Sequence, residues 1–441
     1  MKNAARAAVV GGENDQGVLV QAGLRKGGED AADAVVEVLN EGDVFRPLLV
    51  HPRGALDDPG KPLRRRFDGE MRRVVGQVEE ERLVFVLRAP AEELFAEEIA
   101  ALVQDDHYEK PPGWRMSARA VHTYICGGKA GKRPITAKYI GHERLVEIAI
   151  ATLVTDRALL LIGEPGTAKS WLSEHLAAAI NGDSTKVVQG TAGTTEEHIR
   201  YTWNYAMLIA QGPSREALIK SPIFRAMESG TLARFEEITR CASEVQDAMI
   251  SLLSEKRISV PELETEVAAK RGFSVIATAN TRDRGVNEMS AALKRRFDFE
   301  TVFPILDYDQ ELALVEEASA KLLARSNIPR TVPAPVLELL VSTFRDLRGG
   351  PGGAGGAAMD RLNAVMSTAE AVNVAHAVGV RAWFLEQRDG TPADLVDCIA
   401  GTVVKDDADD RAKLRRYFEQ KVAGRAGGHW RAYFEARNRL P

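Results

Sequence analysis

The chain has 441 residues, enough for two or three domains with separate hydrophobic cores. Hydrophobic residues make up 45% and charged residues 27%, which is ordinary for a globular protein and excludes a low-complexity disordered chain. The net charge of −5 gives no general attraction to nucleic acid or to an anionic membrane surface.

The cysteines and the apolar segments bear on where the protein works. Cys126, Cys241 and Cys398 are far apart, and no CxxC pair is present, which argues against a disulfide framework or a zinc site. The first residues have too short an apolar run for a signal peptide. The longest apolar region, 145–162, contains three charged residues and is therefore a poor membrane span. These features predict a cytoplasmic protein.

The N-terminal part carries few signals. Residues 1–85 contain only two short strand-like runs, at 45–50 and 83–87, and a basic cluster at 61–73 that we interpret as a solvated surface. A helical pattern covers 90–103, and the Pro-Pro-Gly turn at 111–113 ends that segment.

The middle of the chain alternates between strand and helix patterns. An amphipathic helix is expected at 143–153, followed by strands at 158–162, 186–189, 231–235 and 273–277 with helices between them. This order predicts an α/β fold with a parallel sheet flanked by helices. After residue 304 only helices are expected, apart from a glycine-rich run at 349–356. We therefore predict an extension of unknown fold (1–85), a helical segment (86–135), an α/β core (136–308) and a helical domain (309–441).

A phosphate-binding loop follows the first predicted core strand. The segment 163–170 reads GEPGTAKS and matches G-x-x-x-x-[G/A]-K-[S/T]. In such a loop, backbone N–H groups and a helix N-terminus converge on phosphate oxygens. Lys169 is expected to reach the β- and γ-phosphates, and the Ser170 hydroxyl is expected to bind Mg²⁺. Ala168 replaces a glycine, and we expect it to start the helix with a negative φ. The predicted nucleotide-binding residues here are Gly163, Glu164, Pro165, Gly166, Thr167, Ala168, Lys169, Ser170 and Trp171.

Two carboxylates end a later predicted strand. Such a pair alone is typical of a solvated helix start, but its position after the phosphate loop favours catalysis. We expect Glu236 to bind the magnesium ion and Glu237 to act as the general base for the attacking water. Asn280, at the end of the next predicted strand, is expected to orient that water. Arg234 is an anomaly, because a central strand rarely buries a charge without a partner.

Two adjacent arginines, Arg295 and Arg296, precede an apolar residue in the segment 292–297. An arginine at a subunit edge can complete a neighbouring subunit's site by stabilising charge on the transferred phosphoryl group. The alternative is that both are surface charges at a helix end.

Together these motifs resemble the AAA+ ATPases, and within them the MoxR-like family of the helix-2-insert clade. The resemblance covers roughly 120–430 and rests on the loop with Ala168, on 221–224, on 236–257 and on 278–280. It implies that Tyr139 and Ile140 lie against adenine and that Arg296 is the arginine finger. It also implies that Arg361 is the sensor 2 arginine, and that 190–212 contains the inserted hairpin. The usual aspartate on the magnesium side is Glu236 here, and residues 1–85 have no counterpart.

The resemblance implies a function and leaves alternatives. The first is a hexameric ring that hydrolyses Mg²⁺-ATP to remodel or activate a protein, with a partner that carries a von Willebrand factor A-type domain. The second is a slowly hydrolysing switch or assembly platform, which the glutamate at position 236 favours. The third is a nucleic-acid motor, which the acidic net charge and the absence of a basic, aromatic-interleaved hairpin at 190–212 disfavour.

Overall fold

The computed structural model describes part of the chain. The described residues are 19–22, 35–40, 43–49, 89–155, 157–280, 288–349, 362, 366–403, 405 and 407–440. The chain contacts divide it into two compact units, 1–88 and 89–441. In the first unit, β1 (Leu19–Ala22), β2 (Val35–Asn40) and β3 (Asp43–Leu49) form an antiparallel sheet in that order. The strand-like run at 45–50 overlaps β3, whereas the run at 83–87 and the basic cluster lie outside the described residues.

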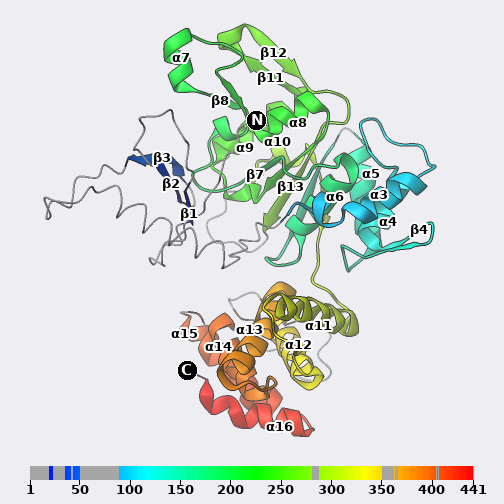
Figure 1. Ribbon diagram of the computed structural model, residues 1–441, viewed down its shortest axis with the longest axis vertical. Helices are drawn as coiled ribbons and strands as arrows, with labels where there is room; N and C mark the ends of the chain where they lie inside the picture. Colours follow the sequence, from blue (N-terminus) through cyan, green and yellow to red (C-terminus); the bar gives the residue numbers. More distant parts are fainter. Residues whose placement is uncertain are drawn as a thin grey trace, which may run out of the picture. The chain divides into compact units, whose positions relative to one another are not determined.

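A five-stranded parallel sheet is the centre of the second unit (Figure 1). Its strands lie in the order β14-β6-β13-β10-β7. Their bounds are β6 (Ala158–Gly163), β7 (Val187–Gln189), β10 (Leu232–Glu236), β13 (Ser274–Asn280) and β14 (Phe297–Thr301). All four pairings are parallel, which confirms the predicted α/β class. The edge strand β14 was not predicted, although its alternating sequence, FDFET, has the period of a half-buried strand.

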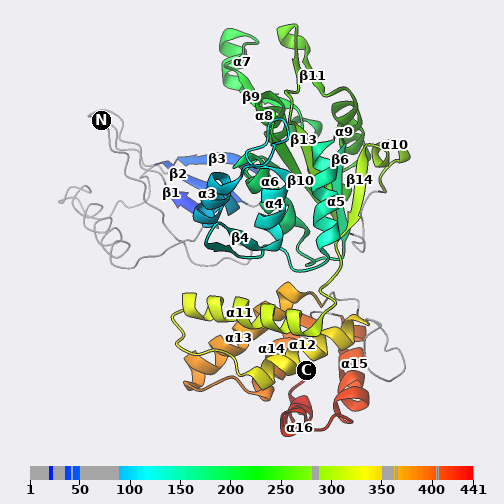
Figure 2. The ribbon, with the colours of Figure 1, turned by 90° about the vertical axis from the view of Figure 1, so that its right-hand side faces the viewer.

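Helices cover both faces of this sheet (Figure 2). One face packs against α5 and α6, through residues such as Leu145 on α5 and Leu172 on α6, and α4 packs against these two helices. The other face packs against α8 and α9, through Phe224 and Met249. The helices are α4 (Ala118–Cys126), α5 (Glu143–Val154), α6 (Lys169–Asn181), α8 (Pro222–Ser229), α9 (Ser243–Glu255) and α10 (Ala291–Lys294).

The segment before the sheet contains two short helices and a hairpin. The predicted helix at 90–103 is interrupted at Phe95, whose φ of −118° is not helical, so that α2 (Ala91–Leu94) and α3 (Ala96–Asp105) are separate. The hairpin of β4 (Gly128–Ala130) and β5 (Arg133–Ile135) follows α4.

Two further antiparallel pairs lie at the same end of the α/β region in both views (Figures 1 and 2). One consists of β8 (Tyr201–Trp203) and β9 (Leu218–Lys220), with α7 (Tyr205–Gln211) between them. The pair overlaps the expected insertion at 190–212 and extends beyond it. The other consists of β11 (Arg257–Val260) and β12 (Thr265–Ala268), which the sequence did not predict. Short helical turns are η1 (Glu196–His198), η2 (Ile238–Arg240) and η3 (Pro261–Leu263).

The C-terminal region is helical, as predicted. Its elements are α11 (Tyr308–Arg325), α12 (Ala334–Arg348), α13 (Thr368–Glu386), α14 (Pro392–Val403), α15 (Ala408–Tyr417), η4 (Phe418–Val422), α16 (Gly428–Glu435) and η5 (Ala436–Arg439). They share one core, in which Phe344, Tyr417, Phe418 and Tyr433 are fully buried. Within the described ranges, no helix combines the length and the apolar character that crossing a membrane requires.

Candidate nucleotide-binding and catalytic site

The glycine-rich loop joins the C-terminal end of β6 to the start of α6. Gly163 is the last residue of β6, and Gly166 has a φ of 74°, which favours glycine. Ala168 also lies in the left-handed region, with φ 67° and ψ 24°, directly before α6. The expected negative φ at Ala168 was therefore wrong. The backbone reverses its direction before the helix starts. This reversal requires a left-handed conformation at position 168, which glycine adopts at the lowest cost.

The loop side chains are bonded to the loop backbone. Lys169 is buried, and its Nζ donates to the carbonyls of Gly163 at 3.1 Å and Glu164 at 2.7 Å. The Thr167 hydroxyl donates to the same Glu164 carbonyl at 2.9 Å. Pro165 is half-buried. The ammonium group is thus held over the loop, where an incoming phosphate can replace carbonyl oxygens as its partner.

The Glu236 carboxylate lies at the start of α6. The Ser170 hydroxyl donates to its Oε2 at 2.6 Å, and the Thr278 hydroxyl donates to the same oxygen at 2.7 Å. The other oxygen, Oε1, lies 2.6 Å from the Ser173 hydroxyl and accepts from Arg234 Nη2 at 2.9 Å. Arg234 therefore has the partner that its buried position on a central strand requires. A hydroxyl and a carboxylate are oxygen donors that suit Mg²⁺, so these residues fit that ion.

Glu237 and Asn280 lie at the same edge of the sheet as the loop. Glu237 directly follows β10 and adopts a left-handed φ of 54°. Its N–H donates to Thr278 Oγ1 at 2.9 Å, and its carboxylate accepts from Arg240 at 2.7 Å. Asn280 is opposite Gly163 in the register between β13 and β6. The structure thus brings both residues to the carboxyl end of the sheet, beside the phosphate loop.

The expected adenine-binding segment is attached to the first turn of α6. The Trp171 indole N–H donates to the Lys138 carbonyl at 2.7 Å. Tyr139 is buried and Ile140 is half-buried, and the Tyr139 N–H donates to the carbonyl of Ile125 at 3.0 Å. Burial raises the pKa of the Tyr139 hydroxyl to about 12, so the ring stays neutral at physiological pH. A neutral aromatic and an aliphatic side chain beside the loop are suited to contact a base.

Arg296 is far from the loop of its own subunit. Its carbonyl accepts from the Ala158 N–H, at the amino end of β6. Gly163 lies at the other end of that strand, five residues away, or roughly 16 Å at the rise of a β-strand. Arg296 Nε donates to the Ser254 hydroxyl at 2.5 Å, and Arg295 is exposed. Arg361 lies outside the described residues.

Three residues that contact Glu236 were given no role of their own in the predicted site. Ser173 is one helical turn after Ser170, and Thr278 is two residues before Asn280 on β13. Arg234 was noticed only as an anomaly, although its spacing of two residues from Glu236 places both side chains on one face of β10. That spacing is the sequence signal that could have paired them.

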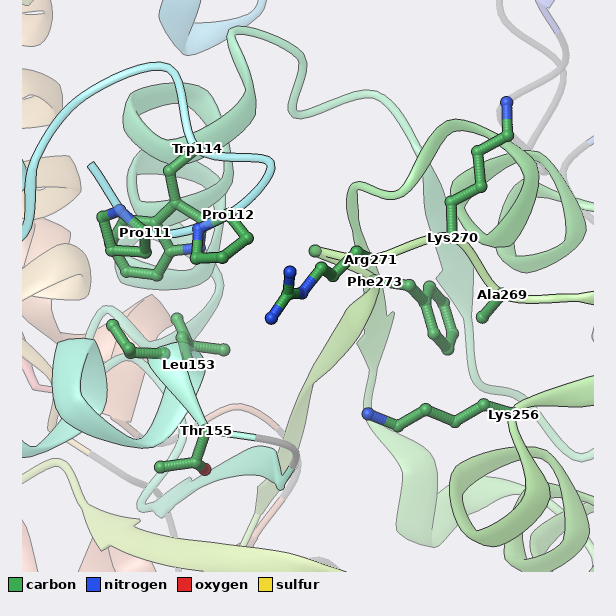
Figure 3. A pocket seen from close by; sticks show the side chains of 12 residues that line it. Pro111, Pro112, Trp114, Leu153, Thr155, Lys256, Ala269, Lys270, Arg271 and Phe273 are labelled. Atoms are coloured by element: carbon green, nitrogen blue, oxygen red, sulfur yellow. The ribbon is translucent and has the colours of Figure 1, made fainter.

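A separate cavity of about 560 Å³ lies at the amino ends of the strands, opposite the end of the sheet that carries the phosphate loop (Figure 3). Leu153 and Thr155 precede β6, and Phe273 precedes β13, so the cavity is at the amino ends of these strands. Figure 3 shows Arg271 between Trp114 and Phe273. The cavity is therefore separate from the phosphate loop, which follows the carboxyl end of β6.

These features define a P-loop nucleotide-binding site on an AAA+ core. The family model of the AAA domain (dynein-related subfamily) matches residues 158–297, and that of the YehL-like AAA+ ATPase C-terminal domain matches 309–441. The YehL protein of Escherichia coli strain K12 is 58% identical over 357 residues, which is 80% of this chain and 98% of the relative.

Solved structures that resemble the chain are more distant. NtrX from Brucella abortus in complex with ATP has 11% identity and a TM-score of 0.41, with 69% of each chain covered. NtrX in complex with ADP has 12% identity and a TM-score of 0.41, with 57% of this chain and 52% of that chain covered. Both TM-scores lie below 0.5, so both likenesses are distant.

The family matches and the YehL relative decide the assignment. The chain belongs to the MoxR-like AAA+ ATPases, in the group that contains YehL.

Proposed function

We propose that the chain hydrolyses Mg²⁺-ATP at the interfaces between subunits of a ring, and uses this cycle to remodel or activate a protein target. The observation that carries the proposal is the division of the site between two ends of the sheet. Glu236, Glu237 and Asn280 lie beside the loop, whereas Arg296 lies at the other end of β6. An arginine in that position cannot reach its own loop, but it can reach the loop of a neighbour in a ring.

Each residue of the site has a proposed role. Lys169 binds the β- and γ-phosphates, and the backbone of 163–168 surrounds them with N–H groups. Ser170 and Glu236 hold the magnesium ion, which supplies positive charge to the phosphate oxygens when bound. Glu237 accepts the proton of the attacking water, and Asn280 orients that water.

The remaining assignments come from the family resemblance. Tyr139 and Ile140 contact adenine, and Arg361 contacts the γ-phosphate from the helical region. We propose a hexamer, a partner with a von Willebrand factor A-type domain, and a place in the cytoplasm. We also propose the division into an extension (1–85), a helical segment (86–135), a nucleotide-binding core (136–308) and a helical lid (309–441).

The test is Mg²⁺-dependent ATP turnover by the purified full chain. Glu237→Gln is expected to reduce turnover by about 100-fold or more, because a general base contributes on the order of 10²–10⁴ in rate. The same variant keeps its affinity for ATP. The matched control is Glu244→Gln, which makes the same change at an exposed position in the first turn of α9 and leaves turnover unchanged. Full turnover in Glu237→Gln would remove Glu237 from the mechanism.

One observation favours the switch or assembly platform as a second candidate. Glu236 is already engaged by four donor groups in the protein, and the additional methylene relative to aspartate changes where its oxygens lie. A platform keeps its ring and its partner in Glu237→Gln and turns over ATP slowly in the wild type. A motor loses its effect on the target in the same variant.

A further inference from the structure

Arg234 is a buried cation on an interior strand of the sheet. Its strand, β10, lies between β7 and β13, and the side chain is 10% exposed. It points to the face of the sheet that α6 covers, because β10 and α6 are in contact and Arg234 donates to residues of that helix. A charged side chain at such a position is costly unless all of its donors are used.

The guanidinium group connects the N-terminal part of α6, and the segment after that helix, to the strand. Nε donates to the Ser173 hydroxyl at 3.0 Å, and Nη2 donates to the Ser170 carbonyl at 3.2 Å. Nη1 donates to the carbonyl of Ser184, beyond the end of α6, at 3.1 Å. The same Nη2 donates to Glu236 Oε1 at 2.9 Å. Arg234 therefore fixes the helix that carries the loop lysine and serine against the strand that carries the acidic pair.

The two oxygens of Glu236 have different surroundings as a result. Oε1 faces Arg234 and Ser173, whereas Oε2 faces the hydroxyls of Ser170 and Thr278. Glutamate has one more rotatable bond than aspartate, so its carboxylate needs an additional constraint to keep one orientation. Arg234 supplies that constraint and directs Oε2 toward Ser170.

We propose that Arg234 is a positioning residue for magnesium, and that Arg234 and Glu236 function as a pair. This inference rests on the proposed Mg²⁺-ATP function. The glutamate side chain is long enough to reach Arg234 with one oxygen and Ser170 with the other. An aspartate at 236 is shorter by one methylene and cannot keep both contacts. The pair explains why this chain has glutamate at the magnesium side.

The test measures equilibrium binding of a fluorescent, non-hydrolysable ATP analogue to the full chain, in EDTA and during a Mg²⁺ titration. Arg234→Met is expected to raise the Mg²⁺ concentration for half-saturation roughly tenfold, as expected for the loss of a hydrogen bond to a charged group. Arg234→Lys gives an intermediate value. Glu236→Asp also raises the half-saturation concentration. The control Arg225→Met, at an exposed position on α8, changes nothing.

The results separate positioning from a purely structural role. A structural role weakens analogue binding equally in EDTA and in Mg²⁺, and that result would overturn the proposal. A lower half-saturation concentration in Arg234→Met would overturn it as well, because Arg234 would then compete with the metal. If Arg234→Met does not fold, Ser173→Ala removes the hydroxyl between Arg234 and Glu236, and we expect a rise of about threefold. Unchanged Mg²⁺ dependence in Ser173→Ala and in Arg234→Lys overturns the proposal.

The wild type distinguishes a failure of the proposed Mg²⁺-ATP function from a failure of the proposed role of Arg234. Analogue binding that is indifferent to Mg²⁺ in the wild type overturns the proposed function, and this inference with it. A Mg²⁺-dependent wild type whose Arg234→Met variant has the same half-saturation concentration overturns the inference alone.

Discussion

Ala168→Gly is expected to stabilise the protein. Ala168 adopts φ 67° and ψ 24°, and a left-handed conformation costs a non-glycine residue about 1–2 kcal/mol. Glycine removes this strain but adds about 0.5–1 kcal/mol of conformational entropy to the unfolded chain. Ala168 is exposed, so almost no buried surface is lost with its methyl group. The net gain in the free energy of unfolding is about 1 kcal/mol, which raises the Tm by about 2–4 °C for a domain of this size.

The measurement is thermal unfolding of the full chain without nucleotide, followed by circular dichroism. The matched control is Ala178→Gly, the same substitution at a buried position inside α6. There, glycine costs about 1 kcal/mol relative to alanine, so the Tm falls. A Tm of Ala168→Gly at or below the wild-type value would refute the account of strain in the loop.

Three further predictions concern other parts of the chain. Gly163→Ala is expected to abolish ATP binding, because a Cβ atom would lie 2.4 Å from the Val302 carbonyl oxygen. Binding of a fluorescent ATP analogue measures the effect, and an affinity equal to that of the wild type would contradict the prediction. Burial alone would raise the pKa of Asp394, but hydrogen bonds from arginine and threonine side chains outweigh it and lower the pKa to about 2. This lowered pKa stabilises the fold by about 2 kcal/mol above pH 4, and the stabilisation is lost as the pH falls toward 2. In chemical denaturation, Asp394→Asn should therefore be less stable than the wild type at pH 7, and the difference in the free energy of unfolding should be smaller at pH 3. Lys138 has a side chain that is 2% exposed, and its carboxylate partner is Glu98 at 2.6 Å. Glu98→Gln removes this partner and is expected to lower the free energy of unfolding by about 3 kcal/mol. Replacing both residues by methionine should restore most of the lost stability.

The sequence predicted where the residues of the proposed site lie at the ends of their strands. The loop 163–170 follows a strongly apolar strand, and the acidic pair and Asn280 each end a strand, so the parallel sheet brings them to one edge. The conformation of Ala168 was predicted wrongly, because the pattern tolerates alanine and does not show that the backbone must be left-handed there.

The remaining features depend on contacts between distant segments. Ser173, Thr278 and Arg234 meet at Glu236 only after α6, β13 and β10 have packed together. The strands β11 and β12 pair with each other outside the main sheet, and each has only four residues, which is a weak signal in a single sequence. These contacts form only when the helices and strands pack together, so the local sequence pattern could not predict them.

We propose that each catalytic site is shared between two subunits, and mixing two inactive variants tests this arrangement. Glu237→Gln lacks the proposed base but keeps Arg296, and Arg296→Ala keeps the base but lacks the arginine. In a randomly mixed ring, about a quarter of the interfaces then combine an intact base with an intact arginine. We predict that the mixture regains Mg²⁺-dependent ATP turnover that neither variant has alone. A mixture as inactive as its components, although both variants assemble together and bind ATP, would contradict the shared site.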